Sequence, residues 1–136
     1  MAQQKKIIDA SVGVKWFSSE EGTDIAKELL HAHIEQKILL IVPDLFFYEV
    51  TNALRYKSRF TQEGLKRVAT ELHDFQLHTA PISLVSLNKT IDTALRFKLT
   101  IYDAVYIALA ELFNTSYITA DKDMLTCGHP SAESLT

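Results

Sequence analysis

Hydrophobic positions recur along this chain with the periods of both helices and strands. From residue 20 to residue 36 they recur at three- and four-residue spacing, which predicts an amphipathic helix. Residues 38–43 (Ile-Leu-Leu-Ile-Val-Pro) form an unbroken apolar run, typical of a strand buried on both faces of a parallel sheet. Residues 5–9 predict a shorter strand that enters the core. The pattern therefore indicates an α/β protein.

The rest of the chain continues this alternation. Further helices are predicted at residues 45–59, 62–77, 84–98 and 102–113, short helical turns at 10–17 and 121–125, and further strands at 80–82 and 116–119. Ser11 and Asp44 are candidate helix caps. Strands separated by helices imply right-handed crossovers. We therefore expect a three-layer α/β/α sandwich around a central parallel sheet of four to five short strands, the fifth at most a short one at residues 132–135.

Composition describes an ordinary globular protein. The 136 residues are 47% hydrophobic and 23% charged, and no linker or repeat divides them, so we expect one domain over residues 1–136. The longest apolar run near the start is Ile7-Ile8, which is too short for a signal peptide or a membrane span. We expect a cytoplasmic protein without a membrane partner. The single cysteine, Cys127, excludes an internal disulfide.

Four acidic residues are predicted to share one edge of the sheet. Asp9 ends the first strand, Asp121 follows the strand at 116–119, and Glu49 and Asp103 lie near the starts of two helices. In a parallel sheet the loops that leave the carboxyl ends of the strands converge, and ligands bind there. These four acids are therefore the candidate site.

Each acid also has a structural interpretation. Asp103 fits a capping box with Thr100, Asp121 fits a helix cap, and Asp9 fits a turn after a strand. Glu49 is harder to explain in this way because its helical neighbours are largely apolar, although an internal ion pair with an arginine remains the alternative. Considered singly, Asp103 is as well explained by capping as by chemistry.

Considered together, four gathered carboxylates would repel one another unless a cation joined them. Mg²⁺ prefers oxygen ligands, and the five histidines form no tight ligand motif, so we expect magnesium rather than zinc. A site of this kind suits phosphodiester hydrolysis with one or two ions. Three neighbouring polar residues would orient carboxylates or waters, namely Ser11, Asn52 and Thr119.

The net charge of −3 argues against binding nucleic acid through bulk charge alone, although a metal-neutralised acidic site would weaken that objection. The basic residues that flank the acidic segments are candidate phosphate contacts, namely Lys15, Arg55 and Lys122. Aromatic residues exceed what one core face needs on the helix that begins at residue 45, which suggests a dimer surface; they are Phe46, Phe47, Tyr48 and Tyr56.

Four segments resemble, in chain order, the acidic motifs of the PIN domain, the nuclease domain of VapC-type toxins. They are IIDAS (7–11), EVTNAL (49–54), YDAVYIALA (102–110) and TADKDML (119–125). The resemblance spans most of the chain. The departure is at the end, where relatives commonly finish with a fifth edge strand.

The resemblance implies an endoribonuclease dependent on Mg²⁺ or Mn²⁺, with RNA as its substrate. It carries the catalytic and metal-binding roles onto Asp9, Glu49, Asp103 and Asp121, with Asp123 as an auxiliary ligand. It also implies the toxin of a type II toxin–antitoxin pair, usually a homodimer, silenced by a small antitoxin whose tail places a basic side chain in the acidic groove. Two alternatives stay open: a structure-specific DNA nuclease, and a non-catalytic dimeric binding module.

Overall fold

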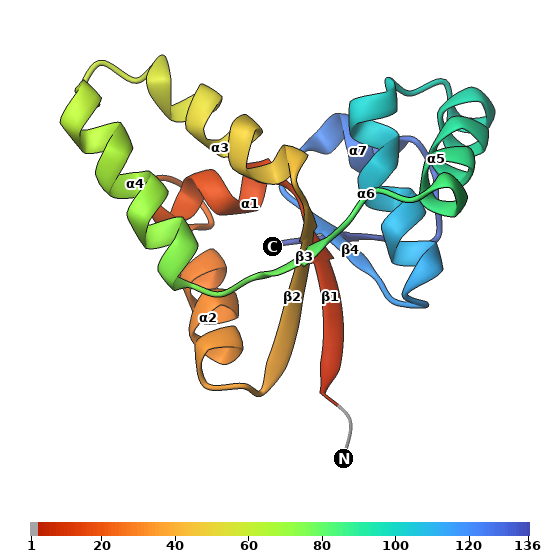
Figure 1. The fold of residues 1–136 in the computed structure, drawn as a ribbon, viewed down its shortest axis with the longest axis horizontal. Coiled ribbons are helices and arrows are strands. Elements are labelled where there is room, and N and C mark those ends of the chain that lie inside the picture. Colours follow the sequence, from red (N-terminus) through yellow and green to blue (C-terminus); the bar gives the residue numbers. More distant parts are fainter. Residues whose placement is uncertain (1–2) are drawn as a thin grey trace.

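Five parallel strands form the centre of the molecule (Figure 1). The structure, a computed structural model, describes residues 3–136. The strands lie in the order β3-β2-β1-β4-β5, and every neighbouring pair is parallel. Their bounds are β1 (Gln4–Ile8), β2 (Ile38–Pro43), β3 (His78–Ala80), β4 (Tyr117–Thr119) and β5 (Ala132–Ser134). The predicted parallel sheet is confirmed, including its short fifth strand.

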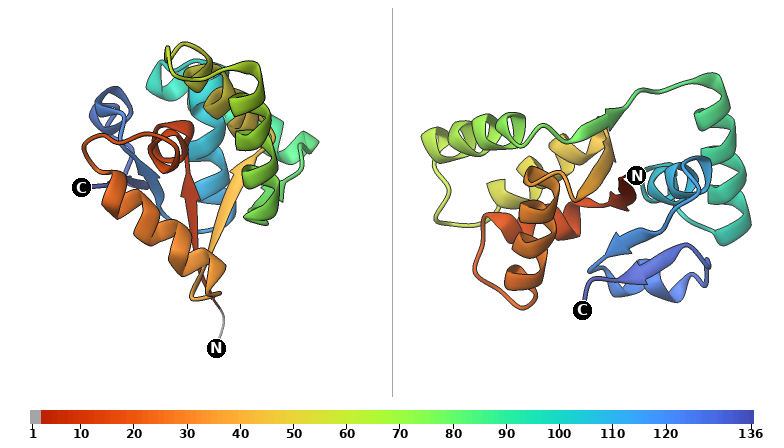
Figure 2. Two further views of the ribbon diagram at one scale, coloured as in Figure 1. Left: turned by 90° about the vertical axis from the view of Figure 1, so that its left-hand side faces the viewer. Right: turned by 90° about the horizontal axis from the view of Figure 1, so that it is seen from below.

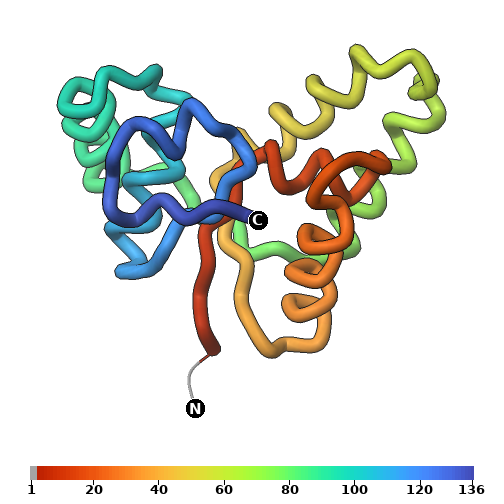
Figure 3. Tube along the Cα trace, turned by 180° about the vertical axis from the view of Figure 1, so that it is seen from behind, coloured from red at the N-terminus to blue at the C-terminus, as the bar shows by residue number. Residues whose placement is uncertain are grey.

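Helices cover both faces of the sheet, as predicted. Helices α1 to α4 lie on one side, and α5 and α6 lie on the other, which the view from below shows most clearly (Figures 1 and 2). From behind, the C-terminus ends between the two groups (Figure 3). The bounds are α1 (Ala10–Gly13), followed by a 3-10 turn (Val14–Trp16), α2 (Thr23–Ile34), α3 (Leu45–Arg55), α4 (Gln62–Asp74), α5 (Leu84–Phe97), α6 (Ile101–Leu112) and α7 (Lys122–Thr126).

Element boundaries differ from the prediction where polar backbone chemistry decides them. Helices α3 and α4 end four and three residues before the predicted ends at 59 and 77. Soon after α4 ends, Gln76 adopts a positive φ of 54°, a conformation that cannot continue a right-handed helix. Strand β3 ends before Pro81 because proline cannot donate a ladder hydrogen bond.

Of the two predicted helix caps, Ser11 is wrong, and Asp44 occupies the N-cap position of α3 without a capping side-chain hydrogen bond. Asp9, not Ser11, caps α1, because Ser11 already lies inside the helix and its amide donates to the Asp9 carboxylate. Asp44 precedes α3, but its backbone is already helical (φ −53°, ψ −34°) and its side chain makes no capping hydrogen bond. The chain therefore enters α3 directly from β2.

The core holds α3 against the start of the chain. Phe46 is fully buried and its ring centroid lies 6.0 Å from that of Trp16. A Cβ at Gly13 would lie 2.6 Å from Phe46 Cζ, so only glycine allows α1 to approach α3 this closely. Burial of Phe46 corrects the prediction that it belongs to a dimer surface. Within residues 3–136, none of the helices is long and apolar enough to span a bilayer.

Candidate active site

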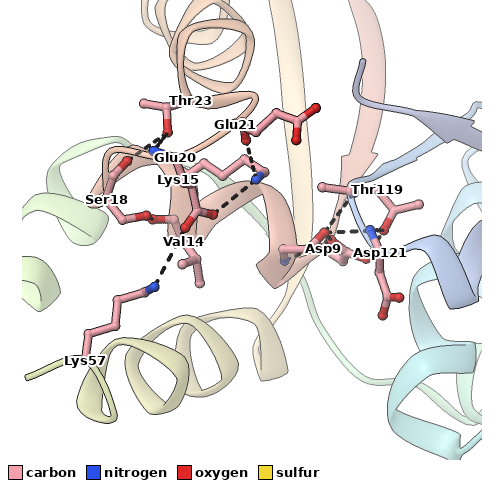
Figure 4. Close-up of polar contacts among 12 residues, drawn as sticks. Asp9, Val14, Lys15, Ser18, Glu20, Glu21, Thr23, Lys57, Thr119 and Asp121 are labelled. Atoms are coloured by element: carbon pink, nitrogen blue, oxygen red, sulfur yellow. Dashed lines mark hydrogen bonds and ion pairs between the residues drawn. The ribbon is translucent and has the colours of Figure 1, made fainter.

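Asp9 lies where β1 ends and α1 begins, and the protein surrounds its carboxylate with hydrogen-bond donors. Its Oδ1 atom accepts from the Ser11 amide (3.0 Å) and from Ser11 Oγ (2.5 Å). Its Oδ2 atom accepts from Thr119 Oγ1 (2.6 Å) and from the Tyr117 hydroxyl. Figure 4 shows Asp9 facing Thr119. Within residues 3–136, the donors to this carboxylate therefore come from the start of α1 and from β4, the strand beside β1 in the sheet.

The donors to Asp9 are themselves held in place. Ser11 Oγ accepts from the Ala120 amide (2.9 Å), and Thr119 Oγ1 accepts from the Asp121 amide (3.0 Å). Burial raises the pKa of Asp9, and the hydrogen bonds from Ser11, Thr119 and Tyr117 offset only part of that rise. The network therefore holds the carboxylate in place, although burial still makes its ionisation harder than in water.

Glu49 lies in the second turn of α3 and makes contact with α6. Its Oε1 atom accepts from the Tyr106 hydroxyl at 2.5 Å. Burial raises the pKa of Glu49; the hydrogen bond from Tyr106 opposes this rise, and the charges of Asp103 and Asp9 add to it. The influence of those two charges shows that the helix-borne and strand-borne acids share one electrostatic environment.

Asp103 and Asp121 occupy the starts of α6 and α7. The Thr100 hydroxyl accepts from the Asp103 amide (3.1 Å), but within residues 3–136 no return bond joins the Asp103 carboxylate to the Thr100 amide. Only half of the predicted capping box is therefore present. The predicted cap at Asp121 is confirmed, because its Oδ1 atom accepts from the Asp123 amide at 2.9 Å. Burial raises the pKa of Asp103; a side-chain hydrogen bond with Thr100 opposes this rise, and the charges of Asp121 and Asp123 add to it.

The acids share one edge of the sheet without converging at ligand distances. Across residues 3–136, no three Asp, Glu, His or Cys side chains form a preassembled metal-binding group. Of the ion pairs in the same range, none involves Asp9, Glu49, Asp103, Asp121 or Asp123. Like charges without a cation between them repel. The edge is therefore looser than the compact cluster that the sequence predicts.

The donor chemistry of this edge fits a hard divalent cation. Carboxylate oxygens are the ligands that Mg²⁺ and Mn²⁺ prefer, and here they have no lysine or arginine partner. The raised pKa values of Asp9, Glu49 and Asp103 report first the cost of burying these carboxylates, and neighbouring negative charges add to that cost at Glu49 and Asp103. A cation would remove that cost.

The predicted phosphate contacts lie in different settings. Lys15 Nζ is 3.1 Å from Glu20 Oε1 and donates to the Glu21 carbonyl at 2.6 Å, so its charge is already paired (Figure 4). Arg55 and Lys122 are exposed. Asn52 is also exposed, one turn after Glu49. A contact of any of these residues with nucleic acid stays a prediction.

Two tyrosines complete the site, and the sequence analysis missed both. The rings of Tyr106 and Tyr117 stack with centroids 5.9 Å apart and an interplanar angle of 16°. Burial raises the pKa of both hydroxyls, and the nearby carboxylates raise it further, so both remain donors. Two spacings could have revealed them: Tyr106 lies one helical turn after Asp103, and Tyr117 shares a strand face with Thr119.

Comparison with known proteins identifies a family and a shared fold. The family model for the PIN domain matches residues 6–128 of this chain. A chain from a toxin–antitoxin complex of Klebsiella pneumoniae has a similar fold, with a TM-score of 0.73, 20% identity, and coverage of 96% of this chain and 98% of that one. No curated protein sequence matches this chain.

Two further solved structures have the same fold at lower identity. VapC20 of Mycobacterium tuberculosis, a Sarcin-Ricin loop cleaving toxin, has a TM-score of 0.70 at 11% identity, covering 93% of this chain and 97% of that chain. A chain of VapBC2 from Rickettsia felis, solved with a DNA fragment from its promoter, has a TM-score of 0.69 at 9% identity, covering 96% and 98%. The shared fold spans nearly the whole of each chain.

Proposed function

This chain belongs to the PIN-domain family, and on that basis we propose that it is a divalent-metal-dependent endoribonuclease, the toxin of a type II toxin–antitoxin pair. The observation that supports this proposal best is the set of acids at the carboxyl edge of the sheet, none of which has a cationic partner within residues 3–136. Buried acids that serve the fold alone are usually compensated by a cationic side chain, and these are not.

The proposed roles follow from the position of each residue. Asp9, Glu49 and Asp103 would hold a first Mg²⁺ or Mn²⁺, directly or through water. Asp121 would complete a second site or orient the attacking water, with Asp123 as an auxiliary ligand. A bound cation supplies Lewis acidity to phosphodiester hydrolysis. Ser11 and Thr119 keep the Asp9 carboxylate in one orientation, and Asn52 is placed to orient a water beside Glu49.

The proposed partners are RNA and a small antitoxin. VapC20, which shares this fold, is described as cleaving the Sarcin-Ricin loop, and the Klebsiella chain comes from a toxin–antitoxin complex. These acids have no lysine or arginine partner within residues 3–136, so they offer an antitoxin side chain the same oxygens that a metal would take. An arginine or lysine from such a tail would form charge-assisted hydrogen bonds with them.

We also propose a homodimer, formed by the outer face of α5. This helix buries small, mostly polar residues and exposes its large apolar ones. The buried residues are Ser86, Thr90, Thr93 and Ala94. Large apolar side chains lie exposed on and beside it, among them Leu84 (75% exposed) and Leu95 (77%); the others are Ile82, Val85, Leu87, Ile91, Ile101 and Tyr102. Soluble monomers rarely expose so large a continuous apolar surface.

A second copy of this chain is the occupant that suits this face. Eight large apolar or aromatic side chains on and beside α5 are at least 39% exposed, and a second copy would cover them in one interface. Asp92 and Arg96 lie one turn apart on α5, so an antiparallel two-fold pairing can place each beside the opposite charge of the other copy. Of the aromatic residues predicted for a dimer surface, Tyr48 is exposed on α3 and Tyr56 directly after it, and α3 lies across the sheet from α5 (Figure 1).

Matched RNA and DNA oligonucleotides test the activity. We expect the wild type to cleave RNA only when Mg²⁺ or Mn²⁺ is added, and Asp9→Asn to lose about 100-fold or more of the rate, because a neutral amide cannot help to hold the cation. Asp74→Asn, at an exposed end of α4, is the matched control and should keep full activity. Cleavage by Asp9→Asn at the wild-type rate would refute the assignment. Faster cleavage of DNA than of RNA would support the alternative of a structure-specific DNA nuclease. If the folded protein cleaved neither, that would support the alternative of a non-catalytic binding module.

Light scattering tests the dimer. Leu95→Glu places a charge in the centre of the proposed interface and should convert a dimer at tens of micromolar into a monomer. Ile34→Glu, an exposed apolar position on α2, is the control and should leave the mass unchanged. A wild type that is monomeric at this concentration contradicts the proposed interface.

A further inference from the structure

The carboxylate of Asp9 has no free lone pair. An ionised carboxylate offers about four acceptor sites on its two oxygens. Ser11 fills two of them with its amide and its hydroxyl, and Thr119 and Tyr117 fill the other two. A cation that binds Asp9 directly must therefore take the place of one of these four donors.

The other acids at this edge are open. Glu49 accepts a single hydrogen bond, from Tyr106, on one of its two oxygens. Asp121 accepts one, from the Asp123 amide. Both are also less buried than Asp9. Asp9 is therefore the acid at which hydrogen-bond donors of the protein compete most directly with a cation for the carboxylate oxygens.

Of the four donors, the Tyr117 hydroxyl is the least constrained. The Ser11 amide belongs to the backbone of α1. The Ser11 and Thr119 hydroxyls each also accept a backbone amide, so neither can turn away without breaking a second hydrogen bond. The Tyr117 hydroxyl accepts no backbone amide from residues 3–136, so moving it away from Asp9 breaks no second backbone hydrogen bond.

We propose that the Tyr117 hydroxyl is a placeholder for the divalent cation on Asp9 Oδ2. In the metal-free protein it donates to that oxygen and compensates a buried charge, and it turns away when the cation binds. The hydroxyl therefore lowers the affinity of the site for metal and stabilises the metal-free state. This inference rests on the proposed function, because it requires that Asp9 be a metal ligand.

A positioning role for Tyr117 would have the opposite sign. If the hydroxyl stayed bonded to Asp9 in the metal-bound protein and oriented it, its removal would weaken binding. If Tyr117 only filled the core, its removal would leave binding unchanged. The affinity for metal therefore distinguishes the three roles, which a loss of activity would not.

Calorimetric titration of the full chain with Mn²⁺ tests the proposal without any substrate. We expect Tyr117→Phe to bind Mn²⁺ about five-fold tighter than the wild type, since a hydrogen bond to a charged group no longer opposes binding. Tyr106→Phe is the matched control: it removes the other hydroxyl of the stacked pair, but Glu49 already has an open oxygen, so its affinity should not rise. Thermal melting of both variants verifies that they fold.

A second measurement follows the Tyr117 hydroxyl itself. Mg²⁺ added to Tyr106→Phe protein should shift the near-ultraviolet absorbance of tyrosine, because the Tyr117 hydroxyl loses its charged partner, and the double variant Tyr106→Phe/Tyr117→Phe should lack that shift. Affinity that Tyr117→Phe leaves unchanged or weakens would overturn the placeholder alone. A folded wild type that binds no Mn²⁺ would instead contradict the proposed function.

Discussion

The two ends of α6 carry acids in opposite electrostatic settings. Asp103, in the first turn, has no cationic partner within residues 3–136, and burial with neighbouring negative charges raises its pKa. Glu111, near the other end, contacts His129 Nε2 with Oε1 (2.5 Å) and Lys89 Nζ with Oε2 (3.0 Å). Burial raises the pKa of Glu111, but these hydrogen bonds and charges outweigh it and lower the pKa overall.

The difference separates acids that support the fold from acids that await a ligand. Glu111 joins α6 to α5 through Lys89 and to the segment before β5 through His129, whose Nδ1 atom also accepts the Ser131 amide. Its charge is compensated by the protein itself. At the other end of the same helix that compensation is missing, which is the pattern expected where a cation or a basic partner binds.

The largest expected effect is at the unpaired end. Asp103→Asn should reduce RNA cleavage about 100-fold, because it removes a charge from the proposed cation site. Its free energy of unfolding without metal should stay equal or rise, because the folded state carries the cost of ionising this carboxyl. Parallel cleavage assays and urea unfolding curves measure both quantities. A variant that cleaves normally, or that is clearly destabilised, would place Asp103 with the structural acids.

At the paired end we expect the reverse, and a smaller effect. Glu111→Gln should reduce the free energy of unfolding by about 1 kcal/mol at pH 7, since the group is partly exposed and solvent weakens its ion pairs. Cleavage should be unchanged. Glu63→Gln, an exposed acid on α4, is the control for loss of a charge.

The pH dependence of the stability difference between wild type and Glu111→Gln tests whether the charge of Glu111 causes it. Because the pKa of Glu111 is lowered below 4.5 in the folded protein, its contribution is complete above pH 4.5 and disappears as the pH falls through the folded-state pKa. The stability gap between wild type and Glu111→Gln should therefore close in acid. A gap that persists unchanged to the lowest pH at which the protein folds would show that packing, and not charge, accounts for it.

The sequence predicts the layout of the fold and the position of the acids, because both follow from local periodicity. The apolar run at 38–43 became β2, and the four acids lie at the carboxyl edge as expected. Local periodicity does not predict which side chains from distant segments come into contact. Nothing near Asp9 in the sequence indicates that the Tyr117 hydroxyl donates to it. Periodicity likewise does not indicate that Lys15 forms an ion pair with Glu20.

Helix α5 shows a different limit. The spacing of its apolar residues correctly predicts a helix, but this spacing alone does not tell which face of the helix is buried. Small residues such as Thr90 and Ala94 allow α5 to pack closely on α6, which leaves Leu84 and Leu95 outside. Phe46 shows the converse, because an aromatic residue assigned to the surface lies in the core.

The hydrogen bonds of Asp9 also determine when the site can exist during synthesis. Tyr117 and Thr119 lie 108 and 110 residues after Asp9, whereas β1 and β2 can pair as soon as the first third of the chain has emerged. Contacts over such separations form last, because closing the long loop between them costs entropy. A growing chain therefore carries Asp9 for most of its translation without the strand that completes its surroundings. A cell that makes this protein would meet an assembled site only once residues 117–119 have left the ribosome.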